Sequence, residues 1–217
     1  WTDGGRRRVE VSSEYAVQMH GIAKRFGAFT ALDCVDLDVR KQSVHAILGE
    51  NGAGKTTLMN ILYGLYQSDE GEIYLNGQKA SITSPTEAIR HGIGMVHQHF
   101  MLIENFTVTE NIILGDEVCG AAGILDMNRA RQKVMELVER YGFDVDPDAK
   151  IEDISVGMQQ RVEILKALFR GAEILILDEP TAVLTPQEID KLLEIMQDLI
   201  AGGKTIIIIT HKLKEIM

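Results

Sequence analysis

The chain has 217 residues, 45% of them hydrophobic, and a formal net charge of −10. This composition is typical of a folded domain with a sizeable core. The acidic excess argues against a nucleic-acid surface, because phosphate contacts need Lys and Arg. No apolar run approaches the length of a membrane span, and Cys34 and Cys119 show no metal or redox spacing. We therefore expect a soluble, cytoplasmic protein with unpaired thiols.

The two ends of the chain differ from its middle. Trp1–Ser13 shows no clear periodicity, and we expect it to be a leader or linker. A single domain is expected over residues 14–217. Lys212–Met217 reads as the start of a helix, so we expect the C-terminal part of the domain to be truncated.

Two segments near the N-terminus alternate apolar with polar residues. Tyr15–Met19 and Leu37–Val39 are therefore predicted to be half-buried antiparallel strands. Phe26 and Phe29 lie between them, beside glycine. An aromatic residue here can stack on adenine or belong to the core, and spacing alone leaves both interpretations open.

A glycine-rich segment follows the predicted strand Val44–Leu48 and precedes a predicted helix. It has the form G-x-x-x-x-G-K-[ST] of a phosphate-binding loop. Its glycines allow backbone N–H groups to converge on phosphate, Lys55 supplies a cation, and the Thr56 hydroxyl can ligate Mg²⁺. The predicted nucleotide-binding residues are Gly49, Glu50, Asn51, Gly52, Ala53, Gly54, Lys55, Thr56 and Thr57.

Short elements are predicted after this loop. Glu72–Gly77 reads as a strand ending in an Asn-Gly turn. Ser84–Glu87 has the Pro and capping-box spacing of a helix start. Gly94–His99 is predicted to be a short strand that carries Gln98.

The pattern then becomes helical over about residues 100–170. Asn128–Tyr141 has apolar residues at three-to-four spacing, and Ser155–Arg161 leads into a further helix. Because this section interrupts the strands, we expect it to form a separate helical lobe.

Buried strands resume towards the C-terminus. Ile174–Leu177 is an unbroken apolar run, typical of a parallel strand covered on both faces. Thr185–Glu188 opens a helix with a cap and a first-turn Pro, Gly202-Gly203 ends it, and Thr205–Thr210 is another buried strand. This order predicts an α/β fold with a parallel sheet.

Polar residues at these strand ends suggest hydrolytic chemistry. Asp178 can hold Mg²⁺ through water, and Glu179 can orient the attacking water; the alternative is an ordinary solvated strand end. His211 can contact a γ-phosphate, although a lone His is more often structural. Gln98 can reach the metal and the water, or can simply be a polar strand end.

These segments together resemble the nucleotide-binding domain of ATP-binding-cassette (ABC) transporters. The likeness rests on Gly49–Thr57, Gln98, Ser155–Gln160, Ile174–Glu179 and Thr210-His211 in the family's order and spacing, and it covers nearly all of the chain from Tyr15 on. A narrower run, Gly92–Phe100 with Leu102, Asn105–Val108 and Glu110–Ile112, is similar to ATPases of simple-sugar and nucleoside importers. Those carry two such domains in one polypeptide, and this chain resembles the first.

The resemblance implies a P-loop NTPase fold: a mixed sheet with a parallel core, an antiparallel β subdomain and an inserted helical subdomain. It implies ATP and Mg²⁺ as cofactors and an ATPase activity that energises import. Phe26 matches the aromatic residue that stacks on adenine. The implied catalytic residues are Glu179 as general base, His211 as switch, Gln98 and Lys55; those near the metal are Thr56, Gln98 and Asp178.

The resemblance also implies a signature segment that caps the γ-phosphate bound by an opposite domain, formed by Ser155, Val156, Gly157 and Gln159. The family's usual Leu-Ser-Gly-Gly-Gln reads Ile154–Met158 here, which predicts a weaker composite site. Val183–Thr185 lacks the aspartate usual in the inter-domain loop, which puts cross-talk between sites in doubt.

The implied partners are a second ABC ATPase domain, membrane permease subunits contacted by the lobe from Gln98 through 105–111, and indirectly a solute-binding protein, but no nucleic acid. The implied location is peripheral, on the cytoplasmic face of the cell membrane. One alternative is a ribosome- or DNA-associated ABC ATPase, which the acidic charge and ordinary lobe length oppose. The other is a regulatory domain without turnover, which Glu179 and His211 oppose.

Overall fold

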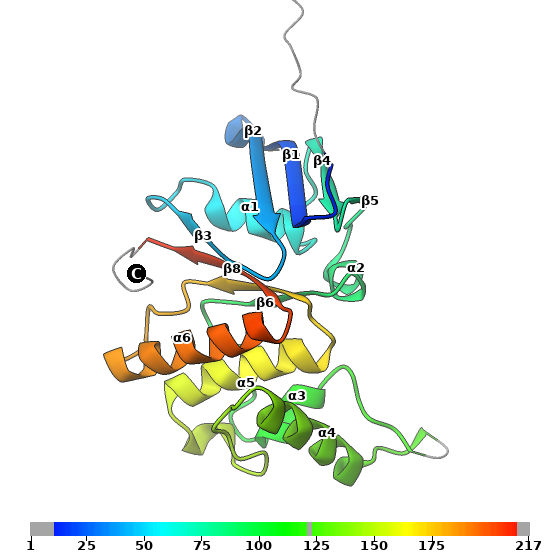
Figure 1. The fold of residues 1–217 in the computed structure, drawn as a ribbon, viewed down its shortest axis with the longest axis vertical. Helices are drawn as coiled ribbons and strands as arrows, with labels where there is room; N and C mark the ends of the chain where they lie inside the picture. The colour runs from blue at the N-terminus through cyan, green and yellow to red at the C-terminus, as the bar shows by residue number, and fades with distance from the viewer. Residues whose placement is uncertain (1–10, 121–122, 212–217) are drawn as a thin grey trace, which may run out of the picture.

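The computed structural model describes residues 11–120 and 123–211. An antiparallel sheet lies at one end of the molecule, a parallel sheet in the middle and helices at the opposite end (Figure 1). Most of the predicted leader and the predicted final helix start fall outside the described residues, while residues 11–13 hold no strand or helix. None of the helices within the described ranges is both long and apolar enough to cross a membrane.

The antiparallel sheet has the order β2-β1-β4-β5. Its strands are β1 (Tyr15–Phe26), β2 (Phe29–Arg40), β4 (Glu70–Leu75) and β5 (Gln78–Ala80). Both segments predicted from alternation are confirmed as strands, but β1 and β2 are far longer than predicted. Bulges shift the register of the pair and so interrupt the alternation along the sequence. Asn76 and Gly77 have φ of 53° and 81°, so the predicted Asn-Gly turn joins β4 to β5.

The second sheet has the order β3-β8-β7-β6, with every described pair parallel. Its strands are β3 (Val44–Leu48), β8 (Thr205–Thr210), β7 (Ile174–Asp178) and β6 (Ile93–Val96). The prediction that the short strand continues to His99 was wrong. Pairing with β7 stops at Val96, so Gln98 lies in the loop that leads to the helical lobe.

The helices begin largely where the sequence signals placed them. They are α1 (Lys55–Leu62), α2 (Pro85–Arg90), α3 (Val108–Ile113), α4 (Met127–Arg140), α5 (Val156–Phe169) and α6 (Pro186–Ala201), with a 3₁₀ turn at Ile151–Asp153. The capping box at the start of α6 is complete, and Gly202 caps its end. At α2 only half of the expected box forms, because the Glu87 carboxylate accepts from the Thr83 N–H at 2.7 Å instead.

The parallel sheet separates two hydrophobic clusters. On one face, Ile207 and Ile209 of β8 pack with α1 and the antiparallel sheet. On the other face, Ile206 and Ile208 pack with α5 and α6. Successive side chains of β8 point to opposite clusters, and both faces of the strand are covered. This explains why the strand reads as a continuous apolar run.

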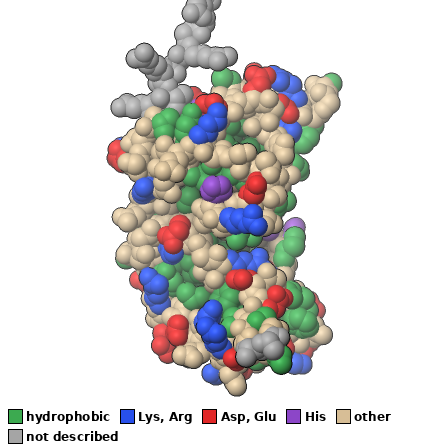
Figure 2. Space-filling view, turned by 90° about the vertical axis from the view of Figure 1, so that its right-hand side faces the viewer, with side chains coloured by type: hydrophobic (Ala, Val, Ile, Leu, Met, Phe, Trp, Pro, Cys, Tyr) green, Lys and Arg blue, Asp and Glu red, His purple; other side chains and the backbone are tan. Residues whose placement is uncertain are grey.

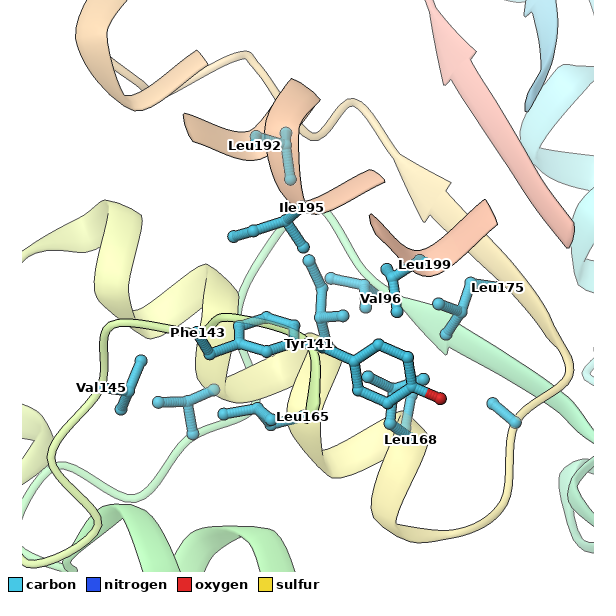
Figure 3. Packing of buried hydrophobic residues seen from close by; sticks show 14 of the residues in the cluster. Val96, Tyr141, Phe143, Val145, Leu165, Leu168, Leu175, Leu192, Ile195 and Leu199 are labelled. Atoms are coloured by element: carbon cyan, nitrogen blue, oxygen red, sulfur yellow. The ribbon is translucent and has the colours of Figure 1, made fainter. Parts of the chain in front are cut away.

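The helical lobe shares the second cluster and has in addition, among the described residues, only a small cluster of its own, formed by Ile113, Val118 and Ala130. Figure 3 shows Leu165 of α5 and Tyr141 at the end of α4 packed with Leu175 of β7 and Leu199 of α6. Gly94 of β6 permits this contact, because a Cβ there would lie 2.9 Å from the Ala167 Cβ. The predicted helical lobe therefore packs against the parallel sheet through α5.

Charges on the face shown in Figure 2 are mixed. Acidic and basic side chains are interspersed along the long axis, with hydrophobic side chains exposed between them. Among the described residues on this face, no extended area carries a single charge.

Candidate functional site

The predicted phosphate-binding loop lies between β3 and α1, as its sequence context required. Gly52 and Gly54 have φ of 85° and 82°, a region that side chains with a Cβ rarely adopt. A Cβ on Gly54 would also lie 2.7 Å from Leu32 Cδ2 and 2.8 Å from the Ala31 carbonyl oxygen. The second glycine of the motif is therefore required by both conformation and space.

Lys55 is held over this loop as the first residue of α1. Its Nζ donates to the carbonyl oxygens of Gly49 at 2.7 Å and Glu50 at 2.9 Å. No side chain caps the N-terminus of α1 and its first turn holds no acidic residue. The ammonium group and the amides of the first turn are thus available to a phosphate.

A cleft of about 490 Å³ opens beside the loop. It brings together the loop, the ends of β7 and β8, and the start of β2. The lining residues are Phe29, Ala31, Asn51, Gly52, Ala53, Gly54, Lys55, Thr56, Thr57, Gln98, Asp178, Glu179 and His211. Most of the residues predicted for nucleotide, metal and catalysis therefore face one cavity.

Glu179 and His211 meet at the carboxyl ends of neighbouring parallel strands. His211 Nδ1 lies 2.8 Å from Glu179 Oε1, and the Glu179 side chain is 12% exposed. Glu179 has a left-handed backbone with φ of 49°, while its N–H donates to the Ile209 carbonyl at 2.9 Å. This strained turn is held by β8 and aims the carboxylate towards the cleft.

Asp178 is buried at the end of β7. Burial raises the pKa of its carboxyl and the nearby Glu179 carboxylate raises it further, while His97 and Lys55 oppose the shift. A buried pair of carboxylates suits a divalent cation, which would neutralise them. With the Thr56 hydroxyl and the Gln98 amide in the same cleft, these oxygen donors fit Mg²⁺.

The aromatic residue that lines the cleft is Phe29, not Phe26. Phe29 is 64% exposed and Phe26 43% exposed, so neither belongs to the core. The Phe26 ring packs edge-on against Tyr66, with centroids 5.3 Å apart. Both residues lie at the tip of the β1-β2 hairpin, opposite one another, and the position predicted to stack on adenine lies beside the cleft lining rather than in it.

The predicted signature residues do not line the cleft. Ser155 is the N-cap of α5, where its hydroxyl accepts from the Met158 N–H at 3.3 Å. Val156 is 43% exposed. The Gln159 side chain does not point to solvent but donates to the Ile151 carbonyl at 3.3 Å. The exposed part of the signature segment is therefore the first turn of α5.

Sequence reasoning missed two side chains that tie this turn to its surroundings. Buried Gln160 donates from Nε2 to the Pro180 carbonyl at 2.7 Å, which lies next to Glu179. The Glu188 carboxylate accepts from the Gly157 N–H at 3.2 Å. The available signal for Gln160 was its place between Val156 and Ile164, at the spacing of one helical face. The capping-box spacing of Glu188 predicted only its contact within α6.

Comparison with known proteins places the chain among ATP-binding proteins. The ABC transporter family profile matches residues 32–182. The nucleoside import ATP-binding protein NupA of Lactococcus lactis is 60% identical over 206 residues, covering 95% of this chain and 40% of that protein. The guanosine import ATP-binding protein NupO of Bacillus subtilis is 59% identical, covering 89% and 38%. The chain thus spans about two fifths of the length of these relatives.

Solved structures share the fold. An ATP-binding cassette of an ABC transporter, in its ADP conformation, aligns with a TM-score of 0.81 at 29% identity, covering 93% of this chain and 83% of that one. The dimeric structure of a bacterial ABC transporter cassette aligns with a TM-score of 0.75 at 26% identity, covering 92% and 89%. The predicted fold class is confirmed.

Proposed function

The chain belongs to the ABC transporter family, and we propose on that basis that it binds and hydrolyses ATP to power an importer for a nucleoside or simple sugar. The two relatives near 60% identity are named for nucleoside and guanosine import. A nucleoside is therefore the favoured cargo class. The observation that carries the proposal is the convergence of Lys55, Asp178, Glu179 and His211 on one cleft.

Binding would begin at the loop between β3 and α1. The triphosphate would accept from the loop amides and from Lys55 Nζ, replacing that cation's contacts with the Gly49 and Glu50 carbonyls. Phe29 offers the adenine an exposed aromatic face at the cleft, and Phe26 is its partner on the opposite strand of the same hairpin. The loop would thereby fix the phosphates relative to the strand ends.

Hydrolysis would use the strand-end carboxylate. Glu179 would accept a hydrogen bond from the attacking water and orient it towards the γ-phosphate. His211, 2.8 Å from that carboxylate, would hold its orientation and reach the transferred phosphoryl group. Mg²⁺, held by Thr56, Gln98 and Asp178, would neutralise charge on the β- and γ-phosphate oxygens.

The proposed partners follow from two parts of the chain that lie outside this cleft, the signature turn and the helical lobe. The signature residues do not line the chain's own cleft, so we propose that they complete the site of a second ABC ATPase domain, in the same polypeptide. The helical lobe would contact membrane permease subunits fed by a solute-binding protein, and the chain would then lie peripherally on the cytoplasmic face of the membrane. The dimeric structure of a cassette with the same fold supports the pairing of two such domains.

Glu179→Gln tests the proposal in the reconstituted transporter. The variant should bind ATP with unchanged affinity, because the amide keeps the shape of the site, but its turnover should fall by ~10²–10⁴ because the base is lost. Binding is measured by nucleotide titration and turnover by phosphate release. Wild-type turnover in the variant would remove Glu179 from the role of base, and absence of ATP binding by the wild type would reject the function.

A further inference from the structure

The Glu188 carboxylate connects the first turns of α5 and α6. Its Oε1 accepts from the Ser155 hydroxyl at 3.3 Å and from the Gly157 N–H at 3.2 Å. Its Oε2 accepts from the Thr185 N–H at 2.9 Å and the Thr185 hydroxyl at 3.0 Å. One oxygen therefore serves the helix that Glu188 belongs to, and the other satisfies the donors of the signature turn.

Gly157 is the residue that lets the carboxylate come so close. A Cβ on Gly157 would lie 2.5 Å from Glu188 Oε1 and 2.7 Å from its Cδ. The Thr185 N–H, and more weakly the other three donors, lower the pKa of Glu188 although partial burial opposes them. Glu188 is thus an anion at neutral pH, lying directly on the donors at the start of a 14-residue helix.

We propose that Glu188 is an internal competitor for the phosphate that the signature turn receives from the opposite domain. The inference rests on the proposed role of Ser155 and Gly157. A phosphate oxygen needs the same N–H and hydroxyl donors that Oε1 now holds. A carboxylate left in place would also repel a phosphate at contact distance. Closure therefore requires Oε1 to leave the turn.

The contacts of the second oxygen make this displacement reversible. The Thr185 donors keep Oε2 at the start of α6, so a change of the side-chain torsions that pivots the carboxylate about Oε2 frees the signature turn without unfolding the capping box. The carboxylate returns when the opposite phosphate leaves. Glu188 would in this way raise the ATP concentration needed to close the two domains.

Glu188→Gln in the complete two-domain polypeptide tests the proposal. The glutamine oxygen keeps an acceptor for Thr185, while the charge that competes with phosphate is removed. The concentration of a non-hydrolysable ATP analogue at half-maximal closure, followed by energy transfer between labels on the two domains, should fall by about three- to tenfold. An unchanged or higher concentration would overturn the proposal.

A matched control and a second variant separate contact from charge. Glu87 accepts from the Thr83 N–H and hydroxyl at 2.7 and 2.6 Å before α2 but touches neither Ser155 nor Gly157, so Glu87→Gln should leave closure unchanged. Glu188→Asp keeps the charge but shortens the side chain away from α5, and it should close as readily as Glu188→Gln. Wild-type closure in the Asp variant would attribute any gain to net charge and reject the competitor.

The readouts also distinguish this inference from the proposed function. Nucleotide titration of the chain's own loop should give the same affinity in every variant, since Glu188 does not line that cleft. Loss of binding in the wild type would reject the function itself. Normal binding together with closure that does not respond to Glu188 would reject the competitor alone.

Discussion

Lys55 is the cation that the cleft offers to a triphosphate. Lys55→Ala should weaken ATP binding by about 10- to 100-fold, because charge-assisted hydrogen bonds to phosphate are lost. The measurement is equilibrium titration with labelled nucleotide. Lys79→Ala is the control, since Lys79 pairs with Glu72 on the antiparallel sheet and should not affect binding. Equal affinity in both variants would contradict the assignment of Lys55.

Substitutions of Gly52 and Gly54, the two positive-φ glycines of the loop, distinguish the effect of backbone strain from that of steric crowding. Gly52 has no atom within 4 Å of an added Cβ, whereas Gly54 meets Leu32 and the Ala31 carbonyl. Gly52→Ala should therefore cost about 1–2 kcal/mol of stability through strain alone. Gly54→Ala should cost ~1–3 kcal/mol more through overpacking. Urea unfolding compares the pair, and equal losses would show that the loop relaxes around the extra methyl group.

At this scale, the sequence was informative where chemistry dictates a residue type at fixed spacing. The loop glycines, Lys55, and the Asp178-Glu179 pair were predicted for roles that stay predictions, and the structure brings them to one cleft. The choice of Phe29 over Phe26 depends on the path of the β1-β2 hairpin, and the contact of Glu188 with α5 depends on the packing of α5 against α6. Neither is encoded in local spacing.

Among the elements, α3 depends on one buried amide. Asn111 is 0% exposed; its Oδ1 accepts from the Ile103 N–H at 2.7 Å, and its Nδ2 donates to the Ile103 and Thr107 carbonyls at 3.0 Å each. Asn111→Ala should destabilise the fold by about 1–3 kcal/mol, because it removes three hydrogen bonds of a buried side chain and takes from the Ile103 N–H its acceptor. Chemical denaturation measures the loss. Exposed Asn105→Ala should be nearly neutral.

Element types were predicted well because the apolar runs and caps are strong local signals. The boundaries that failed are those set by tertiary pairing. Strands β1 and β2 extend as far as each finds its partner, and β6 ends where β7 no longer pairs with it. The half-formed capping box at α2 has a local cause instead, since Thr83, four residues earlier, donates to the Glu87 carboxylate.

For the whole molecule, the shared core predicts cooperative unfolding of sheet and lobe. Leu165 of α5 is fully buried between them, so Leu165→Ala should cost ~2–5 kcal/mol. Hydrogen exchange should show α4 and β7 amides losing protection together. Ile124→Ala is the control, because Ile124 is 70% exposed. Loss of protection in α4 alone would show that the lobe is an independent unit.

The α/β class with an antiparallel sheet and a helical section was predictable from the order of elements. The continuity of the lobe with the sheet was not, because it depends on α5 serving both at once. Gly94, where a Cβ would lie 2.9 Å from the Ala167 Cβ, reads in the sequence only as a weak strand residue. Its meaning appears once the helix that lies on it is known.

The hydrogen bond from Gln160 to the Pro180 carbonyl has a mechanical consequence. The bond directly connects the first half of α5 to the turn that bears Glu179, the carboxylate proposed as the general base. A movement of the signature turn at the start of α5 would therefore be transmitted to the backbone next to Glu179. If the proposed second domain occupies the signature turn, its nucleotide would thus influence Glu179 through Gln160, even though Val183–Thr185 lacks the aspartate that the family resemblance implies.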